Sequence, residues 1–450
     1  MKLKQKNVLV YGLGKSGIAA SNLLNLQGAN VFLYDDDKLS LKSLEKLRFN
    51  NFSYDIIFYL TDEVLSFIDL VILNPAVSIY NDNIIKIKQK NIPIISELEL
   101  AYSHQNGNII AVTGTNGKTT TVELIAHIFQ NSFITATKTG NIGIPFCESV
   151  LNNKKGLFIA EVSSFQLETI KKFRPHIACL LNITQDHLNR HITMENYKLE
   201  KAKIFKNMKK NDYAILNADD ELVMSVLHNL HSSVYFFSTK KQVEQGVFLE
   251  GENIIFKNSK GKKVLFSKNI IKLLGEHNLS NVLCAVLVAL LSKVKLEFII
   301  KAVESFKPKD HRLQFVGVKN EVEYYDDSKA TNVDATLRAV NSFTKNIVLM
   351  LGGSDKGENY DDLFLNLGKN VVQIIVSGEN KQKIINSAKK CGVLCVTKAQ
   401  NFADAFQKCV QLVKKDEIVL LAPASASFDE FKNYAERGET FQKLVNTLWN

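Results

Sequence analysis

Short runs of β-branched and large apolar residues alternate with stretches of helical spacing along the first hundred residues of the 450-residue chain. Each run predicts a strand of a parallel sheet, because a helical stretch separates it from the next run. The predicted strands cover residues 7–11, 31–34, 56–59, 70–73 and 92–95. This alternation is typical of a doubly wound, Rossmann-like domain, which we expect to end near residue 96.

A second unit starts at residue 97, and its pattern changes partway along. Apolar runs first predict parallel strands at 108–112, 157–162, 177–183 and 213–217. Shorter runs then predict antiparallel hairpins added to the sheet, at 234–237, 247–249, 254–256 and 263–266. A helix is predicted over 281–291, and a third α/β unit, again Rossmann-like, follows residue 308. We therefore expect an α/β fold of three domains, 1–96, 97–308 and 309–450.

Composition and charge narrow the class of protein. With 46% hydrophobic and 23% charged residues, the chain is typical of a soluble globular protein. No apolar run approaches the roughly 18 residues that cross a bilayer, and the basic N-terminus precedes too short an apolar run for an export signal. The six cysteines form no CxxC pair, which favours reduced thiols in a cytoplasmic protein.

The net charge of +10 is compatible with nucleic acid or with a small polyanionic substrate. The lysines are scattered, however, and form neither a block nor a stripe interleaved with aromatic residues. We therefore expect no nucleic-acid partner and no membrane partner, and we interpret most of these lysines as solvated surface residues.

A glycine-rich segment, Thr113–Thr120, follows the apolar run 108–112 and precedes a stretch of helical spacing. Its glycines let backbone N–H groups turn toward a polyphosphate, Lys118 adds a positive charge, and the Thr119 hydroxyl is suited to Mg²⁺. A standard P-loop has glycine at position 112, where this chain has Val112. The remaining GTNGKT still predicts a nucleoside triphosphate site, so the central sheet should be of the P-loop type.

A second glycine-rich turn, Gly12–Gly17, follows the first predicted strand, and Asp35 ends the next one. Alone, this pattern is a weak dinucleotide fingerprint, with Asp35 on a ribose. Because the chain has another phosphate loop, a nucleotide-linked substrate explains the turn better than a nicotinamide cofactor. An NAD-dependent oxidoreductase remains an alternative, but it leaves Lys118 and Glu161 unexplained.

Acidic and imidazole side chains follow two strands of the second unit. Glu161 ends a predicted strand expected beside the phosphate loop, where a carboxylate can hold Mg²⁺. His187 follows the strand at 177–183 beside Asp186, which suits a second metal or an anion. In the third unit, small and polar clusters end the predicted strands, which predicts another ligand crevice at their carboxyl edge.

Taken together, several motifs resemble the Mur ligase family, whose members use ATP to build the peptide of peptidoglycan. The resemblance covers nearly the whole chain, and GLGKSG, SSFQLE and DSKATN are similar to the type that adds D-glutamate to UDP-N-acetylmuramoyl-L-alanine. The motifs that carry it, in chain order, are GLGKSG, GTNGKT, EVSSFQLE, NITQDH, His277-Asn278, His311-Arg312, DSKATN and Gly352-Gly353.

The resemblance implies an amide ligase that uses ATP and two Mg²⁺ ions without a nicotinamide cofactor, acting as a cytoplasmic monomer. The residues implied in catalysis are Lys118, His187, Lys201 and Arg312. Those implied for ATP are Gly114, Thr115, Asn116, Gly117, Lys118, Thr119, Thr120, Asn278, Asn281, His311, Arg312 and Asp327. Those implied for the UDP substrate are Lys15, Ser16, Gly17, Asp35, Asp36, Asn141 and His187. Those implied for D-glutamate are Lys329, Thr331, Lys356, Ser427, Phe428 and Tyr434. Those implied for metal are Thr119, Glu161, His187 and Lys201, the last if it is carbamylated.

Some positions depart from the family pattern or leave alternatives open. Asp36 and Asp37 stand where a hydroxyl and an arginine near the uracil are common. Lys198 and Lys203 are close enough to Lys201 to compete for the carbamylated position. A superfamily member that joins a different amino acid or makes folylpolyglutamate is the alternative of similar chemistry, and GLGKSG and SSFQLE argue against it.

Overall fold

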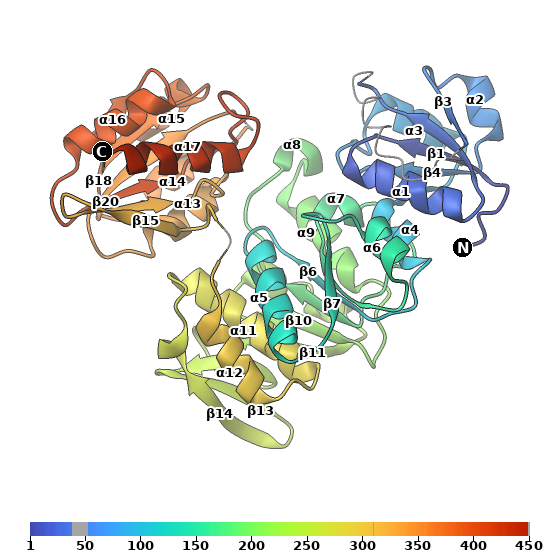
Figure 1. Ribbon diagram of the computed structural model, residues 1–450, viewed down its shortest axis with the longest axis horizontal. Helices are drawn as coiled ribbons and strands as arrows, with labels where there is room; N and C mark the ends of the chain where they lie inside the picture. Colours follow the sequence, from blue (N-terminus) through green and yellow to red (C-terminus); the bar gives the residue numbers. More distant parts are fainter. Residues whose placement is uncertain (38–52, 309, 356, 449–450) are drawn as a thin grey trace. The chain divides into compact units, whose positions relative to one another are not determined.

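The structure is a computed structural model that describes residues 1–37, 53–308, 310–355 and 357–448 (Figure 1). Its contacts divide the chain into two compact units. The first unit comprises residues 1–183, 193–270 and 281–304, and the second comprises 184–192, 271–280 and 305–450. Each unit is described separately below.

The first unit opens with a five-stranded parallel sheet in the order β3-β2-β1-β4-β5. Its strands are β1 (Asn7–Tyr11), β2 (Asn30–Tyr34), β3 (Tyr54–Ile56), β4 (Leu70–Leu73) and β5 (Ile94–Ser96). Its helices are α1 (Lys15–Leu26), α2 (Asp62–Phe67), α3 (Asp82–Gln89) and α4 (Glu97–Tyr102). The strand order reverses between β1 and β4, and such a switch point is where open α/β sheets bind ligands.

Successive side chains of each strand alternate between the two faces of this sheet, and a different pair of helices covers each face. Val8 and Val10 of β1 share a buried cluster with α1 and α4, whereas Leu9 and Tyr11 share another with α2 and α3. Because successive side chains of a strand point to opposite faces, apolar residues at every position require helices on both sides. The unbroken apolar runs of the sequence therefore account for the helices on both faces of this sheet.

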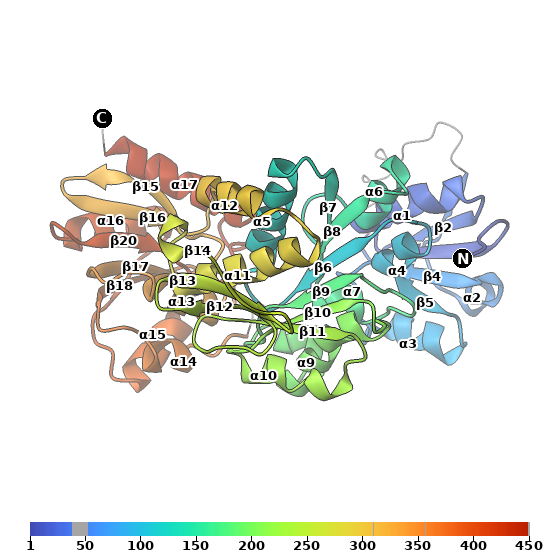
Figure 2. The same ribbon diagram turned by 90° about the horizontal axis from the view of Figure 1, so that it is seen from below.

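The same unit contains a nine-stranded sheet in the order β14-β13-β12-β11-β10-β9-β6-β8-β7, whose strands are labelled in Figure 2. Its strands are β6 (Ile109–Thr113), β7 (Ala136–Gly140), β8 (Leu157–Glu161), β9 (Ile177–Leu180), β10 (Tyr213–Asn217), β11 (Ser233–Ser238), β12 (Gly246–Glu250), β13 (Asn253–Asn258) and β14 (Gly261–Ser267). Its longer helices are α5 (Lys118–Asn131), α6 (Phe146–Asn152), α9 (Met194–Ala202), α11 (Glu276–Leu291) and α12 (Leu296–Ser305). Its single-turn helices are α7 (Ser164–Leu167) and α10 (Glu221–Met224).

The second unit is built on a six-stranded sheet in the order β15-β16-β20-β17-β18-β19, parallel except for the antiparallel β15–β16 pair. Its strands are β15 (Gln314–Lys319), β16 (Val322–Asp326), β17 (Ile347–Gly352), β18 (Val371–Ser377), β19 (Val396–Lys398) and β20 (Ile418–Leu421). Its helices are α13 (Val333–Val340), α14 (Asp361–Leu365), α15 (Lys381–Lys390), α16 (Phe402–Leu412) and α17 (Tyr434–Thr447). This unit also includes the short α8 (Leu188–His191).

Here too, alternating residues divide between two cores. Leu349 and Leu420 pack with helices α13, α14 and α15, whereas Val348 and Val419 pack with α16 and α17. The result is a second doubly covered sheet whose loops gather at the carboxyl ends of its parallel strands. The expected α/β fold of three sheets is therefore present.

Three predictions of secondary structure were inaccurate. The strand predicted at 56–59 is found at Tyr54–Ile56, and β7 is missing from the sequence prediction because ATKTG lacks an apolar run. β11 pairs with β12 in parallel, not as a hairpin, although only seven residues connect them. The pairing extends over three residue pairs, so the connection has to return only about 10 Å along the strand.

Candidate functional site

The predicted phosphate loop lies between β6 and α5, at the carboxyl edge of the nine-stranded sheet. Gly117 caps α5 in the left-handed region, with φ of 83°, and a Cβ there would lie 2.3 Å from Oδ1 of Asn281. A side chain at Gly117 would thus be strained and would collide with α11. The sequence prediction of strand, loop and helix is confirmed here.

Two lysines converge on one carbonyl oxygen of this loop. Nζ of Lys118 lies 2.7 Å from the Gly114 oxygen, and Nζ of the buried Lys201 lies 2.9 Å from the same atom. The Lys201 ammonium also lies 4.5 Å from the ring centre of Tyr197. Two positive charges beside a glycine-rich backbone turn form an environment that favours an anion.

Asn182, to which no role was assigned from the sequence, lies two residues after β9 and forms hydrogen bonds with the phosphate loop. Its side chain accepts from N of Asn116 at 2.8 Å and donates to the Asn116 oxygen at 3.1 Å, while its carbonyl accepts from N of Thr115. A signal was available, because an amide that follows a strand neighbouring the loop can bridge backbone groups.

Thr119, Glu161 and Asn141 form a chain of hydrogen bonds next to the loop, with Thr119 and Glu161 buried and Asn141 exposed. The Thr119 hydroxyl donates to Oε2 of Glu161 at 2.7 Å, and Nδ2 of Asn141 donates to Oε1 at 3.1 Å. Glu161 is only 2% exposed. Paired hydroxyl and carboxylate oxygens are hard donors of the kind that Mg²⁺ binds together with phosphate oxygens. Within the described part of the chain, no three His, Cys, Asp or Glu residues gather as a complete metal cage.

The glycine-rich turn of the first sheet is tightly packed. A Cβ at Gly17 would lie 2.0 Å from the Gly12 oxygen, and one at Gly12 would lie 2.6 Å from Cβ of Asn74. Asp35 accepts from N of Leu13 at 2.6 Å and so closes the turn. Lys15 is exposed and Ser16 half-buried in the first turn of α1. Asp36, in contrast, is engaged by neighbouring tyrosine and asparagine side chains.

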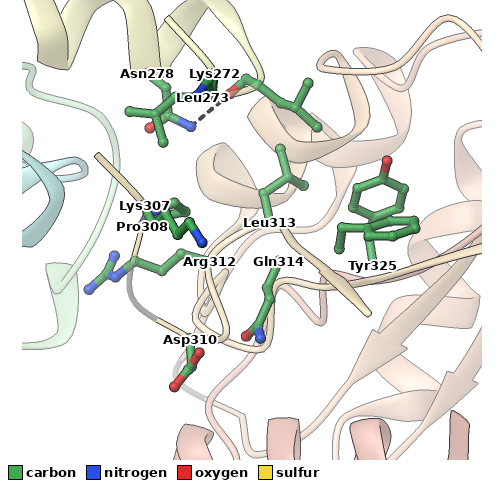
Figure 3. A pocket seen from close by; sticks show the side chains of 12 residues that line it. Lys272, Leu273, Asn278, Lys307, Pro308, Asp310, Arg312, Leu313, Gln314 and Tyr325 are labelled. Atoms are coloured by element: carbon green, nitrogen blue, oxygen red, sulfur yellow. Dashed lines mark hydrogen bonds between the residues drawn. The ribbon is translucent and has the colours of Figure 1, made fainter. Parts of the chain in front are cut away.

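In the second unit, a cavity of about 450 Å³ brings Asn278 and Arg312 together (Figure 3). Figure 3 shows Asn278 and Lys272 near one another, with the Asn278 side chain donating to the Leu274 oxygen at 2.7 Å. Lys307 and Tyr325, which the sequence did not single out, also line this cavity. A cavity of this size with cations and an aromatic wall suits a nucleoside.

His311 and Asp327 are not among the residues that line this cavity, although each lies within two positions of one that does. His311 is 6% exposed, and its Nδ1 lies 2.6 Å from Oδ2 of Asp326. Burial opposes the charged imidazole, but the hydrogen bond and charge of Asp326 prevail and raise the pKa of His311. Burial raises the pKa of Asp327 to about 7.

Of the residues expected to hold an amino acid, Lys329, Thr331, Ser427 and Phe428 lie in loops of the second unit, and Tyr434 begins α17. The Lys329 ammonium lies 4.1 Å from the ring centre of Tyr434, so these two are brought together. Phe428 is 71% exposed, Thr331 is half-buried and Ser427 is buried. Lys356 lies outside the described residues.

The buried Arg437 joins the two loops that carry these residues. Its guanidinium donates to Oγ and O of Ser328 and to the carbonyl oxygens of Ser425 and Ala426. Burial lowers the pKa of Arg437 to about 10.

His187 precedes α8 in the second unit, whereas Glu161, Lys118 and Lys201 belong to the first. Its backbone has φ of 55°, and its Nε2 lies 3.5 Å from Oδ2 of Asp186. A small cavity of about 150 Å³ adjoins both residues and Glu358. The expected ATP and metal residues are thus divided between the two units.

Three family models match consecutive parts of the chain. The Mur ligase MurD-like N-terminal domain matches residues 6–96, the Mur ligase middle domain matches 112–289, and the glutamate ligase domain of Mur ligases matches 311–425.

Relatives match over the full length. A UDP-N-acetylmuramoylalanine–D-glutamate ligase of Lachnoclostridium phytofermentans is 39% identical, covering 100% of this chain and 99% of that protein. One of Caldicellulosiruptor bescii is 38% identical with the same coverage. The solved structure of a MurF ligase of Thermotoga maritima in complex with ADP shares the fold, with a TM-score of 0.62, 19% identity and coverage of 99% and 96%. With its three domains matched in order, this chain is a member of the Mur ligase family, of the MurD-like type.

Proposed function

We propose that this chain is an ATP-dependent ligase that adds D-glutamate to UDP-N-acetylmuramoyl-L-alanine in peptidoglycan precursor synthesis. The names and full-length similarity of the relatives support this proposal. The main structural support for the proposal is the phosphate loop. Two lysines donate hydrogen bonds to its Gly114 oxygen, and the hydrogen-bonded pair Thr119–Glu161 lies beside it. We assign residues 1–96 to the UDP substrate, 97–308 to ATP and 309–450 to the amino acid.

ATP is held at both of its ends by residues of this chain. The phosphate loop, Gly114 to Thr120, binds the phosphates through Lys118 and through backbone N–H groups other than those of Thr115 and Asn116, which Asn182 holds. Asn278 and Arg312 line the cavity for the nucleoside, with Asp327 toward the ribose and His311 supporting Arg312. Asn281, also proposed for the adenine, packs closely against Gly117.

Mg²⁺ fits the Thr119–Glu161 pair, since both side chains present oxygen donors and both are buried. His187, and Lys201 once carbamylated, are the candidates for a second ion. When bound, Mg²⁺ neutralises charge on the phosphates. A carbamate on Lys201 would retain one N–H for the Gly114 oxygen and present oxygens in place of the ammonium.

The reaction joins two anions before it forms the amide. The terminal carboxylate of the UDP substrate attacks the γ-phosphorus of ATP, so an acyl phosphate forms and ADP leaves. Lys118 and Arg312 offset the negative charge that meets at this step. The D-glutamate amine then attacks the acyl carbon, phosphate leaves, and the amine loses a proton to the medium.

The two other substrates are placed by the first and third domains. Lys15, Ser16, Gly17, Asp35 and Asn141 hold the UDP substrate. Lys329, Thr331, Lys356, Ser427, Phe428 and Tyr434 hold D-glutamate, with Lys329 supplying the charge for a carboxylate. We also propose a cytoplasmic monomer. Within the described ranges, no helix is both long and apolar enough to pass through a membrane.

The test is ADP release with UDP-N-acetylmuramoyl-L-alanine and each candidate amino acid in turn. We expect release with D-glutamate, and release only with another amino acid would contradict the proposal. Lys118→Ala should abolish release while the protein stays folded by circular dichroism. Lys138→Ala is the matched control, because this lysine of the same domain pairs with Glu123 at the surface.

A further inference from the structure

Five side chains meet at the carboxyl edge of the first sheet, next to the glycine-rich turn: Tyr11, Tyr34, Asp36, Asn81 and Asn83. They come from different elements, since Tyr11 ends β1, Tyr34 ends β2, Asn81 caps α3 and Asn83 lies in its first turn. We call this group the Asp36 cluster. The family pattern gives no reason for it, because it is centred on a position where this chain departs from that pattern.

The carboxylate of Asp36 accepts hydrogen bonds from side chains of three elements, and the two from tyrosine hydroxyls are the shortest. Oδ2 accepts from the Tyr11 hydroxyl at 2.6 Å and from Asn81 at 3.3 Å, and Oδ1 accepts from the Tyr34 hydroxyl at 2.9 Å and from Asn83 at 3.4 Å. An ionised carboxylate offers about four acceptor sites. Although Asp36 is exposed, each of its two oxygens is therefore already bound to a tyrosine hydroxyl.

Packing of the two tyrosine rings against each other holds their hydroxyl groups in place independently of the carboxylate. Tyr11 and Tyr34 are partners in the β1–β2 register, and their rings pack edge to face with centres 4.9 Å apart. Tyr11 is fully buried and Tyr34 is 8% exposed. Burial, and then the hydrogen bond to Asp36, raise the pKa of Tyr34 to about 12 and raise that of Tyr11 further. Both hydroxyls thus remain donors throughout the physiological pH range.

The fixed position of Asp36 restrains the backbone of Asp35, its neighbour in sequence. Its Oδ2 holds N of Leu13 in the glycine-rich turn, and its Oδ1 holds N of Asp37. If Asp36 is fixed by β1, β2 and α3 together, the backbone at Asp35 cannot turn away from the glycine-rich turn. The turn and Asp35 form the ligand-facing part of the switch point between β1 and β4.

We infer that Asp36 is a positioning residue for the nucleotide end of the UDP substrate, which acts through the Tyr11 and Tyr34 hydroxyls and not by touching the uracil. The identity of the nucleotide rests on the proposed function. The cluster connects three elements through one carboxylate, so loss of any of its strong hydrogen bonds loosens the same part of the site.

The test compares Tyr11→Phe, Tyr34→Phe and Asp36→Asn with the wild-type protein. Each removes a hydrogen bond of the cluster, and we expect each to weaken UDP binding by roughly tenfold in titration calorimetry. The KM for UDP-N-acetylmuramoyl-L-alanine should rise similarly, while kcat and the KM for ATP stay near wild type. Tyr324→Phe, which removes a buried hydroxyl from the six-stranded sheet, is the control and should leave UDP affinity unchanged.

Double variants separate positioning from direct contact. Tyr11→Phe with Asp36→Asn should be less than additive, because both act through one hydrogen bond. Exchange of the two groups, Asp36→Asn with Asn83→Asp, should recover part of the affinity by returning a carboxylate to the cluster. A loss with Asp36→Asn but none with either tyrosine variant would mean direct contact and would overturn the inference. Unchanged UDP affinity in all variants would overturn it too, whereas failure of the wild type to form product would count against the proposed function instead.

Discussion

At the scale of single residues, a buried ion pair supports the arginine that is proposed to face the phosphates. Oδ2 of Asp326 binds His311 and also accepts from Gln442 at 2.8 Å, and its Oδ1 accepts from N of Ser328. His311 and Leu313, on either side of Arg312, have φ of 64° and 46°. Left-handed backbone at non-glycine residues persists only when neighbours hold it, and at His311 the Asp326 carboxylate and the Gln314 side chain do so.

Asp326→Asn should therefore displace Arg312 without touching it. An amide leaves His311 without its counter-charge, so the pKa of His311 falls and the loop loosens. We expect the KM for ATP to rise by roughly tenfold, with little change in the KM for the UDP substrate. In the wild type, the raised pKa of His311 means that this support is complete below pH 6.5 and is lost as the pH rises through that raised pKa. Steady-state kinetics between pH 6 and 9 measure both effects, and an ATP KM equal to that of the wild type would contradict the role of Asp326.

At the scale of elements, the short helix α4 ties the five-stranded sheet to the nine-stranded one. Its Glu99 carboxylate accepts from the backbone N of Lys171, Lys172 and Phe173. Its Glu97 carboxylate accepts from N of Cys147 in α6, and its second oxygen is buried without a hydrogen-bond partner. The two acidic side chains of this six-residue helix thus add directional hydrogen bonds to the apolar cluster that α4 shares with α6 and Phe173.

Glu97 makes this connection sensitive to pH. Burial raises the pKa of Glu97 from 4.5 to about 7, so the folded state binds more protons than the unfolded state between these values. Stability should therefore fall as the pH rises from about 4.5 to 7, by up to about 3 kcal/mol in total. Glu97→Gln keeps an acceptor for Cys147 and carries no charge.

We expect the melting temperature of Glu97→Gln to exceed that of the wild type above pH 7 and the difference to vanish near pH 5. Scanning calorimetry of both proteins across this range provides the measurement. Glu148→Gln, in α6 but not part of this contact, serves as the control. Parallel pH profiles for wild type and Glu97→Gln would show that Glu97 does not carry the dependence.

At the scale of the whole molecule, the residues proposed for one ATP molecule belong to two compact units. Lys118, Thr119 and Glu161 are in the first, whereas Asn278 and Arg312 are in the second. The proposed reaction requires both sets at one ATP molecule, and a reaction that proceeds through an acyl phosphate also requires water to be excluded.

We expect the radius of gyration to decrease when a non-hydrolysable ATP analogue and UDP-N-acetylmuramoyl-L-alanine are added together. Small-angle X-ray scattering with neither, either and both ligands measures the change. Lys118→Ala, which weakens the phosphate site, should reduce it. Profiles that do not differ between the free and doubly liganded wild type would contradict closure.

Much of the fold could be predicted because apolar runs and turn residues are local signals. β1, β4 and β10 begin and end where the pattern indicates, and the family and the three-domain α/β fold are confirmed. β7 and the parallel β11–β12 pair could not be predicted, since both depend on neighbours that the sequence pattern does not name. The site assignments remain predictions, although the structure brings Thr119, Glu161 and Asn141 into one chain of hydrogen bonds.

The sequence by itself determined which chemistry is present: the glycines that allow a phosphate loop, the lysine and hydroxyl within it, and the order of the family's motifs. These are properties of residue type and spacing, so they can be read without coordinates. Only the tertiary structure decided how distant residues are used. It pairs Lys201 with the carbonyl of Gly114 and turns Asp36 onto two tyrosines, because packing of separate strands and helices places their side chains within hydrogen-bond reach.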